Sequence, residues 1–154
     1  MGRNLVGVIG TAIVAIYAIG SGRWVATDSL WYQSLPRLAW QPPGFVFGII
    51  WPYNFIVLGI AAVTIAQRAT STATLIYLTF FALSVACALI WAYQFYRPHN
   101  LEFAVIALFG TALLTLPMVV IAFRTSIPIG FALLPYQLWV ATAATLSYQY
   151  SKLN

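Results

Sequence analysis

The sequence predicts an all-α membrane protein, a bundle of five transmembrane helices with a long loop between helices one and two. Two observations carry this prediction. The 154 residues are 62% hydrophobic and only 6% charged, with a mean hydropathy of +0.90, whereas a soluble domain carries roughly 25% charged residues. The chain also holds five apolar runs that are each long enough to cross a bilayer, which takes about 20 helical residues.

The predicted spans follow one another with little chain between them. They cover residues 4–20, 44–66, 73–96, 101–123 and 127–148. The charged residues fall in the breaks between spans, near the two chain ends or, for Glu102, at the start of a span, where water and lipid headgroups can solvate them. Three of the four breaks are short, and short connections make neighbouring helices antiparallel. We therefore expect one up-and-down transmembrane domain over residues 1–154, with the lipid bilayer around it.

The first span has a second interpretation. Arg3, the apolar run and the small residues Ala15 and Ala18 are also typical of a cleaved signal peptide. The rest of the chain is itself apolar enough to stay in a membrane, and such proteins usually keep their first helix. We therefore favour a first span that is retained.

The connection over residues 21–43 is the exception among the breaks, because it is long. A plain linker would be polar and rich in Gly and Ser, whereas long ordered loops in compact domains are often lids or binding loops. This connection ends on Pro42 and Pro43, which stop any helix before them and prepare a helix start at Gly44. We expect a lid-like loop with four aromatic residues: Trp24, Trp31, Tyr32 and Trp40.

Charge and motif content argue against several function classes. The net charge of +5 comes from basic residues spread singly along the chain, whereas nucleic-acid binding needs a clustered basic face. We therefore expect no nucleic-acid partner. His99 and Glu102 are three residues apart, but both lie at a predicted membrane boundary, where a solvated pair is the simpler interpretation. The sequence shows no nucleophile motif and no metal-ligand cluster, so we expect no catalytic residue, no metal site and no required cofactor.

All six tryptophans fall toward one end of the predicted bundle. Trp51, Trp91 and Trp139 lie in the second, third and fifth spans, and the others lie in the long loop. A one-sided aromatic belt at the membrane interface would give this placement, and so would an aromatic cavity between the helices, which suits flat apolar ligands. The candidate ligand-binding residues are Trp31, Trp40, Phe47, Trp51, Tyr53, Asn54, Trp91, Trp139 and Ala143.

Three amides lie inside the predicted spans: Asn54, Gln94 and Gln137. Polar groups in hydrocarbon usually face the bundle interior and find partners there. Each amide can join two helices or orient the polar edge of a ligand, and we expect them to face protein or ligand.

Two weaker patterns concern sterols and packing. Leu146, Tyr148 and Lys152 satisfy a spacing proposed for cholesterol contact, which chance at a helix end explains equally well. Gly44 and Gly48 form a small-residue step that lets helix backbones approach closely. This step can serve packing within the bundle or a homodimer.

Taken together, these residues resemble the TspO/translocator protein family, also called tryptophan-rich sensory proteins or peripheral-type benzodiazepine receptors. The resemblance covers nearly the whole chain. The most specific match is Trp40-Gln41-Pro42-Pro43-Gly44 followed by Phe47 and Trp51, and a second is Pro135-Tyr136-Gln137-Leu138-Trp139. The sequence departs from the family pattern at Arg37-Leu38, Asn54-Phe55, Ala88 and Ser147.

The resemblance implies a membrane receptor, sensor or carrier that binds porphyrins, and sterols as a second ligand class, in a pocket below the first loop. Relatives are often homodimers, and we expect a homodimer in a bacterial inner membrane rather than in the mitochondrial outer membrane. Light-dependent porphyrin breakdown by some bacterial relatives makes a porphyrin-degrading enzyme the first alternative. A structural accessory subunit of a larger membrane complex is the second.

Overall fold

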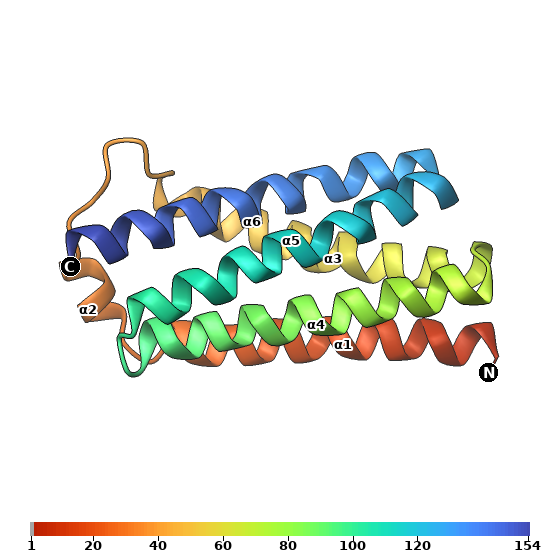
Figure 1. The fold of residues 1–154 in the computed structure, drawn as a ribbon, viewed down its shortest axis with the longest axis horizontal. Helices are drawn as coiled ribbons and strands as arrows, with labels where there is room; N and C mark the ends of the chain where they lie inside the picture. The colour runs from red at the N-terminus through yellow and green to blue at the C-terminus, as the bar shows by residue number, and fades with distance from the viewer. Residues whose placement is uncertain (1) are drawn as a thin grey trace.

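The computed structural model describes residues 2–154, and the regular structure within them is entirely helical. The helices are α1 (Arg3–Val25), α2 (Ser29–Ser34), α3 (Gly44–Arg68), α4 (Ser71–Tyr96), α5 (Leu101–Thr125) and α6 (Ile127–Leu153) (Figure 1). Five of them are 23 to 27 residues long and contain apolar windows with mean hydropathy between 1.4 and 2.4. The predicted five-span membrane fold is confirmed.

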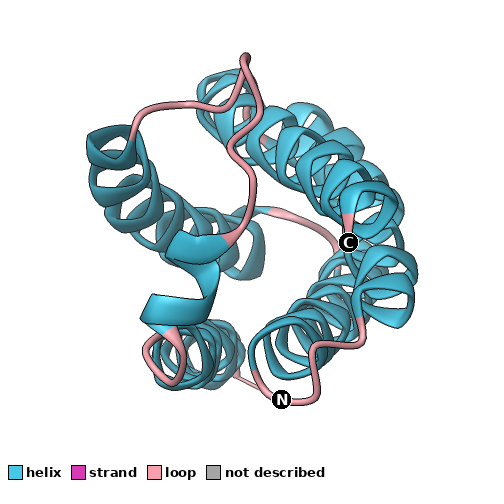
Figure 2. Cartoon of the chain, turned by 90° about the vertical axis from the view of Figure 1, so that its left-hand side faces the viewer, coloured by secondary structure: helices cyan, strands magenta, loops and turns pink. Residues whose placement is uncertain are grey.

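The five long helices close into a ring. Helix α1 packs against α3 and α4, α5 packs against α4 and α6, and α3 packs against α6. The end-on view shows this arrangement around a shared interior (Figure 2). The ring has two ends. The loop end carries the α1–α3 connection, the α4–α5 turn and the C-terminus, whereas α1 begins at the opposite, N-terminal end (Figure 1).

Side-chain caps fix where several helices begin, which keeps the turns short. The Asn100 side chain accepts a hydrogen bond from the backbone N–H of Phe103 at 3.2 Å, and Thr70 does the same for Ala73 at 3.2 Å. Such caps satisfy amide groups that the first helical turn leaves unpaired. Pro43 directly precedes α3, as the Pro pair in the sequence predicts.

The long connection differs in detail from the sequence-based expectation. Helix α1 continues to Val25, and a six-residue helix, α2, forms inside the stretch expected to be a loop. Asp28 caps α2 by accepting a hydrogen bond from the Trp31 backbone N–H at 3.2 Å. A helix this short shows too little periodicity to be recognised in the sequence. Helix α6 also runs to Leu153, beyond the predicted end of the fifth span. Its last turn is polar, so hydropathy alone ends the span too early.

The core lies between the helices, between the cavity described below and the N-terminal end of the ring. Leu58, Phe81 and Tyr136 are fully or almost fully buried, and the hydroxyls of Tyr17 and Tyr136 are 3.5 Å apart. Close helix approach depends on small residues here. A Cβ added to Gly10 would lie 2.5 Å from the Ala62 Cβ, so α1 and α3 touch through these two positions.

The three span amides behave differently from one another. The Gln137 Nε2 donates to the Ala112 carbonyl at 3.0 Å, and its Oε1 accepts from the Thr115 hydroxyl, which joins α6 to α5. Asn54 is completely buried, but within residues 2–154 neither of its side-chain polar atoms has a hydrogen-bond partner. Gln94 is half-buried. Asn54 and Gln137 therefore face protein, as expected.

Candidate ligand cavity

A cavity of about 720 Å³ opens at the loop end of the ring. Its walls come from α1, α2, α3, α4, α6 and the segment 37–43, and among residues 2–154 helix α5 contributes none of them. The lining residues are Ala18, Ser21, Gly22, Val25, Ser29, Tyr32, Gln33, Arg37, Leu38, Gln41, Pro42, Pro43, Gly44, Phe47, Trp51, Phe55, Trp91, Phe95, Tyr96, Trp139, Ala143, Leu146, Ser147 and Tyr150.

Three pairs of aromatic rings form the apolar walls, one on each of three sides. On α3, Trp51 is stacked on Phe55 with ring centroids 5.6 Å apart and planes 25° apart. On α4, Trp91 lies 5.8 Å from Phe95. The third pair joins two helices: Phe47 of α3 meets the Trp139 ring of α6 edge-on, with centroids 4.9 Å apart. Offset and edge-on pairs are the favoured aromatic geometries, so the rings of these walls pack favourably on one another.

A hydrogen bond fixes the orientation of Trp91. Its Nε1–H donates to the Ser147 hydroxyl oxygen at 3.3 Å, which links α4 to α6 across the cavity wall. Ser147 is one of the positions at which the sequence departs from the family pattern. The departure therefore falls on a lining residue that holds a tryptophan in place.

Gln41 connects the covering segment to the rest of the protein. Its Nε2 donates to the Tyr32 hydroxyl at 3.1 Å, and its Oε1 accepts from the Tyr150 hydroxyl, so one amide bridges α2 and α6. Burial raises the pKa of Tyr32, and the neighbouring Tyr150 raises it further. The Tyr32 hydroxyl thus stays protonated over the physiological range. Nearby, the Trp40 Nε1–H donates to the Gln149 side-chain oxygen at 3.0 Å.

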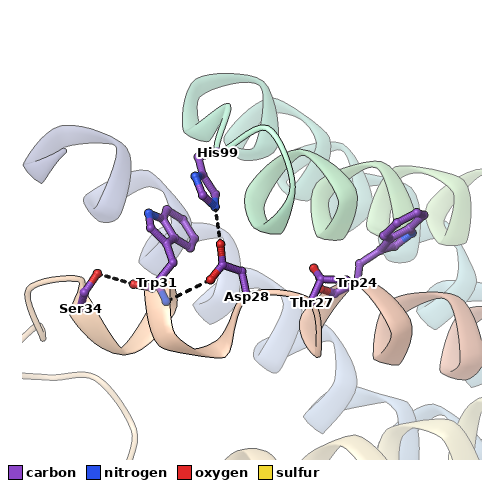
Figure 3. A network of polar contacts seen from close by, with 6 residues as sticks. All are labelled: Trp24, Thr27, Asp28, Trp31, Ser34 and His99. Carbon is purple, nitrogen blue, oxygen red and sulfur yellow. Dashed lines mark hydrogen bonds and ion pairs between the residues drawn. The ribbon is translucent and has the colours of Figure 1, made fainter.

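A second fastening, which we call the His99 clasp, consists of Asp28, Trp31 and His99 (Figure 3). The His99 ring is stacked on the Trp31 ring at 3.8 Å with planes 10° apart, and its Nε2 lies 3.2 Å from the Asp28 carboxylate. Since His99 lies in the α4–α5 turn, the clasp ties α2 to that turn. Glu102, three residues away, is not the partner of His99.

The structure brings some of the predicted ligand-binding residues together. Five of the nine candidates line the cavity: Phe47, Trp51, Trp91, Trp139 and Ala143. The other four lie elsewhere. Trp31 packs behind the cavity wall against Phe95 and Tyr96. Trp40 lies in the segment 37–43 and is 45% exposed. The Tyr53 hydroxyl donates to the Ala132 carbonyl at 2.8 Å outside the cavity, and Asn54 is enclosed in the core.

The three sterol-pattern residues do not share a surface. Leu146 lines the cavity, whereas Tyr148 is 46% exposed, with the Lys152 ammonium 5.4 Å from its ring centroid. Residues two apart on an α-helix point about 200° away from each other, which explains the separation of Leu146 from Tyr148.

Several lining residues are absent from the sequence-based set, among them Phe55, Tyr32, Arg37, Gln41 and Tyr150. Helical spacing could have found Phe55, because it follows Trp51 by four residues and so shares its face. The same spacing relates Trp139, Ala143 and Ser147. Tyr32, Arg37 and Gln41 reach the cavity through the fold of the long connection, for which the sequence offers no periodic signal.

Comparison with known proteins gives a consistent picture. The model of the TspO/MBR family matches residues 10–153. Protein CrtK of Rhodobacter capsulatus is 25% identical over 92% of this chain and 89% of its own length. The membrane protein YtaB of Bacillus subtilis is 27% identical over 99% of both chains. The translocator protein of Bos taurus is 24% identical over 97% of this chain and 86% of its own.

Proposed function

This chain belongs to the TspO/MBR family, and from that premise we propose that it is a receptor, sensor or carrier for porphyrin-type ligands. The five long apolar helices and the family membership make it an integral, multi-pass membrane protein. We further propose that it acts as a homodimer in a bacterial inner membrane. The proposed binding site is the cavity at the loop end.

One observation carries the ligand proposal: Trp51, Trp91 and Trp139 come from three different helices and line one cavity. Aromatic rings offer flat apolar surfaces that stack well on a flat conjugated ligand. The cavity volume of about 720 Å³ lies within the range of roughly 300–1,000 Å³ that is usual for small-molecule sites. Beside these flat apolar walls, the polar side chains of Tyr32, Arg37 and Gln41 form what we call the polar mouth of the cavity. This combination suits a porphyrin.

A sterol is the second ligand class that we propose for the same cavity. Its walls are largely apolar, but of the sterol-pattern residues only Leu146 lines it. We therefore place porphyrins first, since they gain from aromatic walls in a way that a saturated sterol does not.

Titration of the purified protein with protoporphyrin tests the proposal, with Trp fluorescence and porphyrin absorption as readouts. We expect Trp51→Leu, Trp91→Leu and Trp139→Leu each to weaken binding roughly three- to tenfold, which corresponds to about 0.5–1.5 kcal/mol per aromatic contact. Trp24→Leu is the matched control, because Trp24 packs on Tyr93 and under Arg97 outside the cavity. Its affinity should equal that of the wild type.

Unchanged affinity in all three cavity variants would remove the cavity as the porphyrin site. Recording the spectra in the dark and after illumination separates the enzymatic alternative from simple binding. A loss of the porphyrin absorption bands that needs both light and the intact tryptophans would favour light-dependent degradation.

A further inference from the structure

The side chains that line the cavity carry charge of one sign only. Arg37 is the single charged residue among those that line it, and no carboxylate does so in the part of the chain that the structure describes. Asp28 is engaged by His99 in the clasp. Glu102 lies at the start of α5, the long helix that contributes nothing to the cavity. A ligand that enters the cavity therefore meets a positive charge and no fixed negative charge.

Arg37 lies at the polar mouth rather than among the aromatic walls. It belongs to the segment between α2 and α3, together with Gln41, whose amide bonds to Tyr32 and Tyr150. Burial raises the pKa of Tyr32, and the nearby positive charge of Arg37 opposes part of that rise. Arg37 and Tyr32 both line the cavity, and Arg37 is an exposed residue.

Within residues 2–154, the Arg37 guanidinium has no ion-pair or hydrogen-bond partner from the protein. Three other basic residues are engaged: Arg97 lies over the Trp24 ring, Lys152 over the Tyr148 ring, and Arg3 bonds to the Gln67 carbonyl. A guanidinium presents a planar fork of N–H donors that matches a carboxylate in two parallel hydrogen bonds.

We propose that Arg37 anchors a carboxylate of the bound ligand at the cavity mouth, so that the preferred ligands are flat apolar acids with the ring body against the tryptophans. This inference rests on the proposed function for the position of the site, and it narrows the ligand class. In this inference, Arg37 determines the specificity of the cavity for acidic ligands. A neutral ligand, such as an ester or a sterol, makes the aromatic contacts but leaves the guanidinium unpaired.

Paired acidic and neutral ligands test the inference. Protoporphyrin and its dimethyl ester form one pair, and pyrenebutyric acid and pyrenebutanol form a second pair that does not depend on porphyrin recognition. We expect Arg37→Gln to weaken binding of both acids roughly five- to tenfold, as for one partly exposed charge-assisted contact. The same variant should leave the ester and the alcohol unchanged, and Arg37→Lys should keep part of the preference for acids.

The matched control is Arg23→Gln, since Arg23 is a basic residue at the same end of the bundle that does not line the cavity. This variant should bind all four ligands like the wild type. Equal binding of acid and neutral ligand by wild type and Arg37→Gln would overturn the inference and leave the proposed function intact. That same result would arise if Arg37 held a lipid phosphate instead.

The second ligand pair separates failure of the inference from failure of the proposed function. If neither porphyrin binds the wild type, the proposed porphyrin function fails. In that case, Arg37-dependent selection of pyrenebutyric acid over pyrenebutanol would still support an acid-binding mouth. Absence of that selection would overturn the inference as well.

Discussion

Asn54 is an unusual residue for the middle of a membrane helix, because its amide is fully buried and, among residues 2–154, has no hydrogen-bond partner at either side-chain atom. The Tyr77 hydroxyl and the Trp139 Nε1 share this condition. A buried polar group without a partner destabilises the folded state by about 1–3 kcal/mol. Each of these three groups therefore lowers the free energy of unfolding of the protein.

We expect Asn54→Leu to stabilise the protein by about 1–3 kcal/mol, because leucine keeps the branched shape and removes the unpaired groups. Thermal unfolding in detergent measures the effect. Gln137→Leu is the matched control, and its effect on stability should have the opposite sign, since Gln137 forms hydrogen bonds with Thr115 and Ala112. It should lower stability by about 1 kcal/mol. Equal losses in the two variants would mean that the Asn54 amide has a partner in the native protein.

Residue types and helical spacing predicted part of the cavity. Trp51, Trp91 and Trp139 were predicted because large aromatic side chains gather at one depth, and they do line one wall each. Tyr53, also a candidate from the sequence, does not line the cavity, because residues two apart on a helix, such as Trp51 and Tyr53, point to nearly opposite faces. Arg37 and Gln41 could not be predicted, since their positions depend on how the connection folds over the ring.

At the scale of helices, small residues allow α1 and α3 to approach closely. Without a hydrophobic driving force between helices in lipid, packing at small residues is a main source of association. Gly10 meets Ala62 so closely that even a methyl group has no space. Gly59, also on α3, has open space where its side chain would be.

We expect Gly10→Ala to push α1 away from α3 and to lower stability by about 1–3 kcal/mol, the usual range for overpacking. The reverse change at the partner, Ala62→Gly, should restore much of the loss in the double variant. Gly59→Ala serves as the control and should be neutral or slightly stabilising. Thermal unfolding of the four variants measures this, and a double variant no better than Gly10→Ala would contradict direct contact.

The long helices were predictable and the short one was not, for the same physical reason. A bilayer demands about 20 apolar residues for each span, so composition alone locates α1 and α3 to α6. Helix α2 has six residues, and tertiary contacts hold it in place: the His99 clasp on one side and the Gln41 bridge on the other. Its sequence carries a capping residue, Asp28, but no apolar stripe.

For the whole molecule, the ring places the α1–α3 connection and the C-terminus at the same end. In a Cys87→Ala background, we expect Thr27→Cys and Asn154→Cys to react with an impermeant thiol reagent from the same side of sealed vesicles. Ser71→Cys, at the first residue of α4, should react from the other side. Labelling of Thr27→Cys and Asn154→Cys from opposite sides would exclude an odd number of spans.

The one-ended cavity has a kinetic consequence. Its lining residues all come from the loop end, and beneath them the packed core of Leu58, Phe81 and Tyr136 closes the interior. Such a cavity is a dead end, so a ligand leaves by the way it came. For a ligand bound there as we propose, residence time would then depend on how often segment 37–43 releases its hydrogen bonds, such as that of Gln41 to Tyr32. Vectorial movement across the membrane would require the core itself to part, which is a far larger rearrangement than opening the mouth.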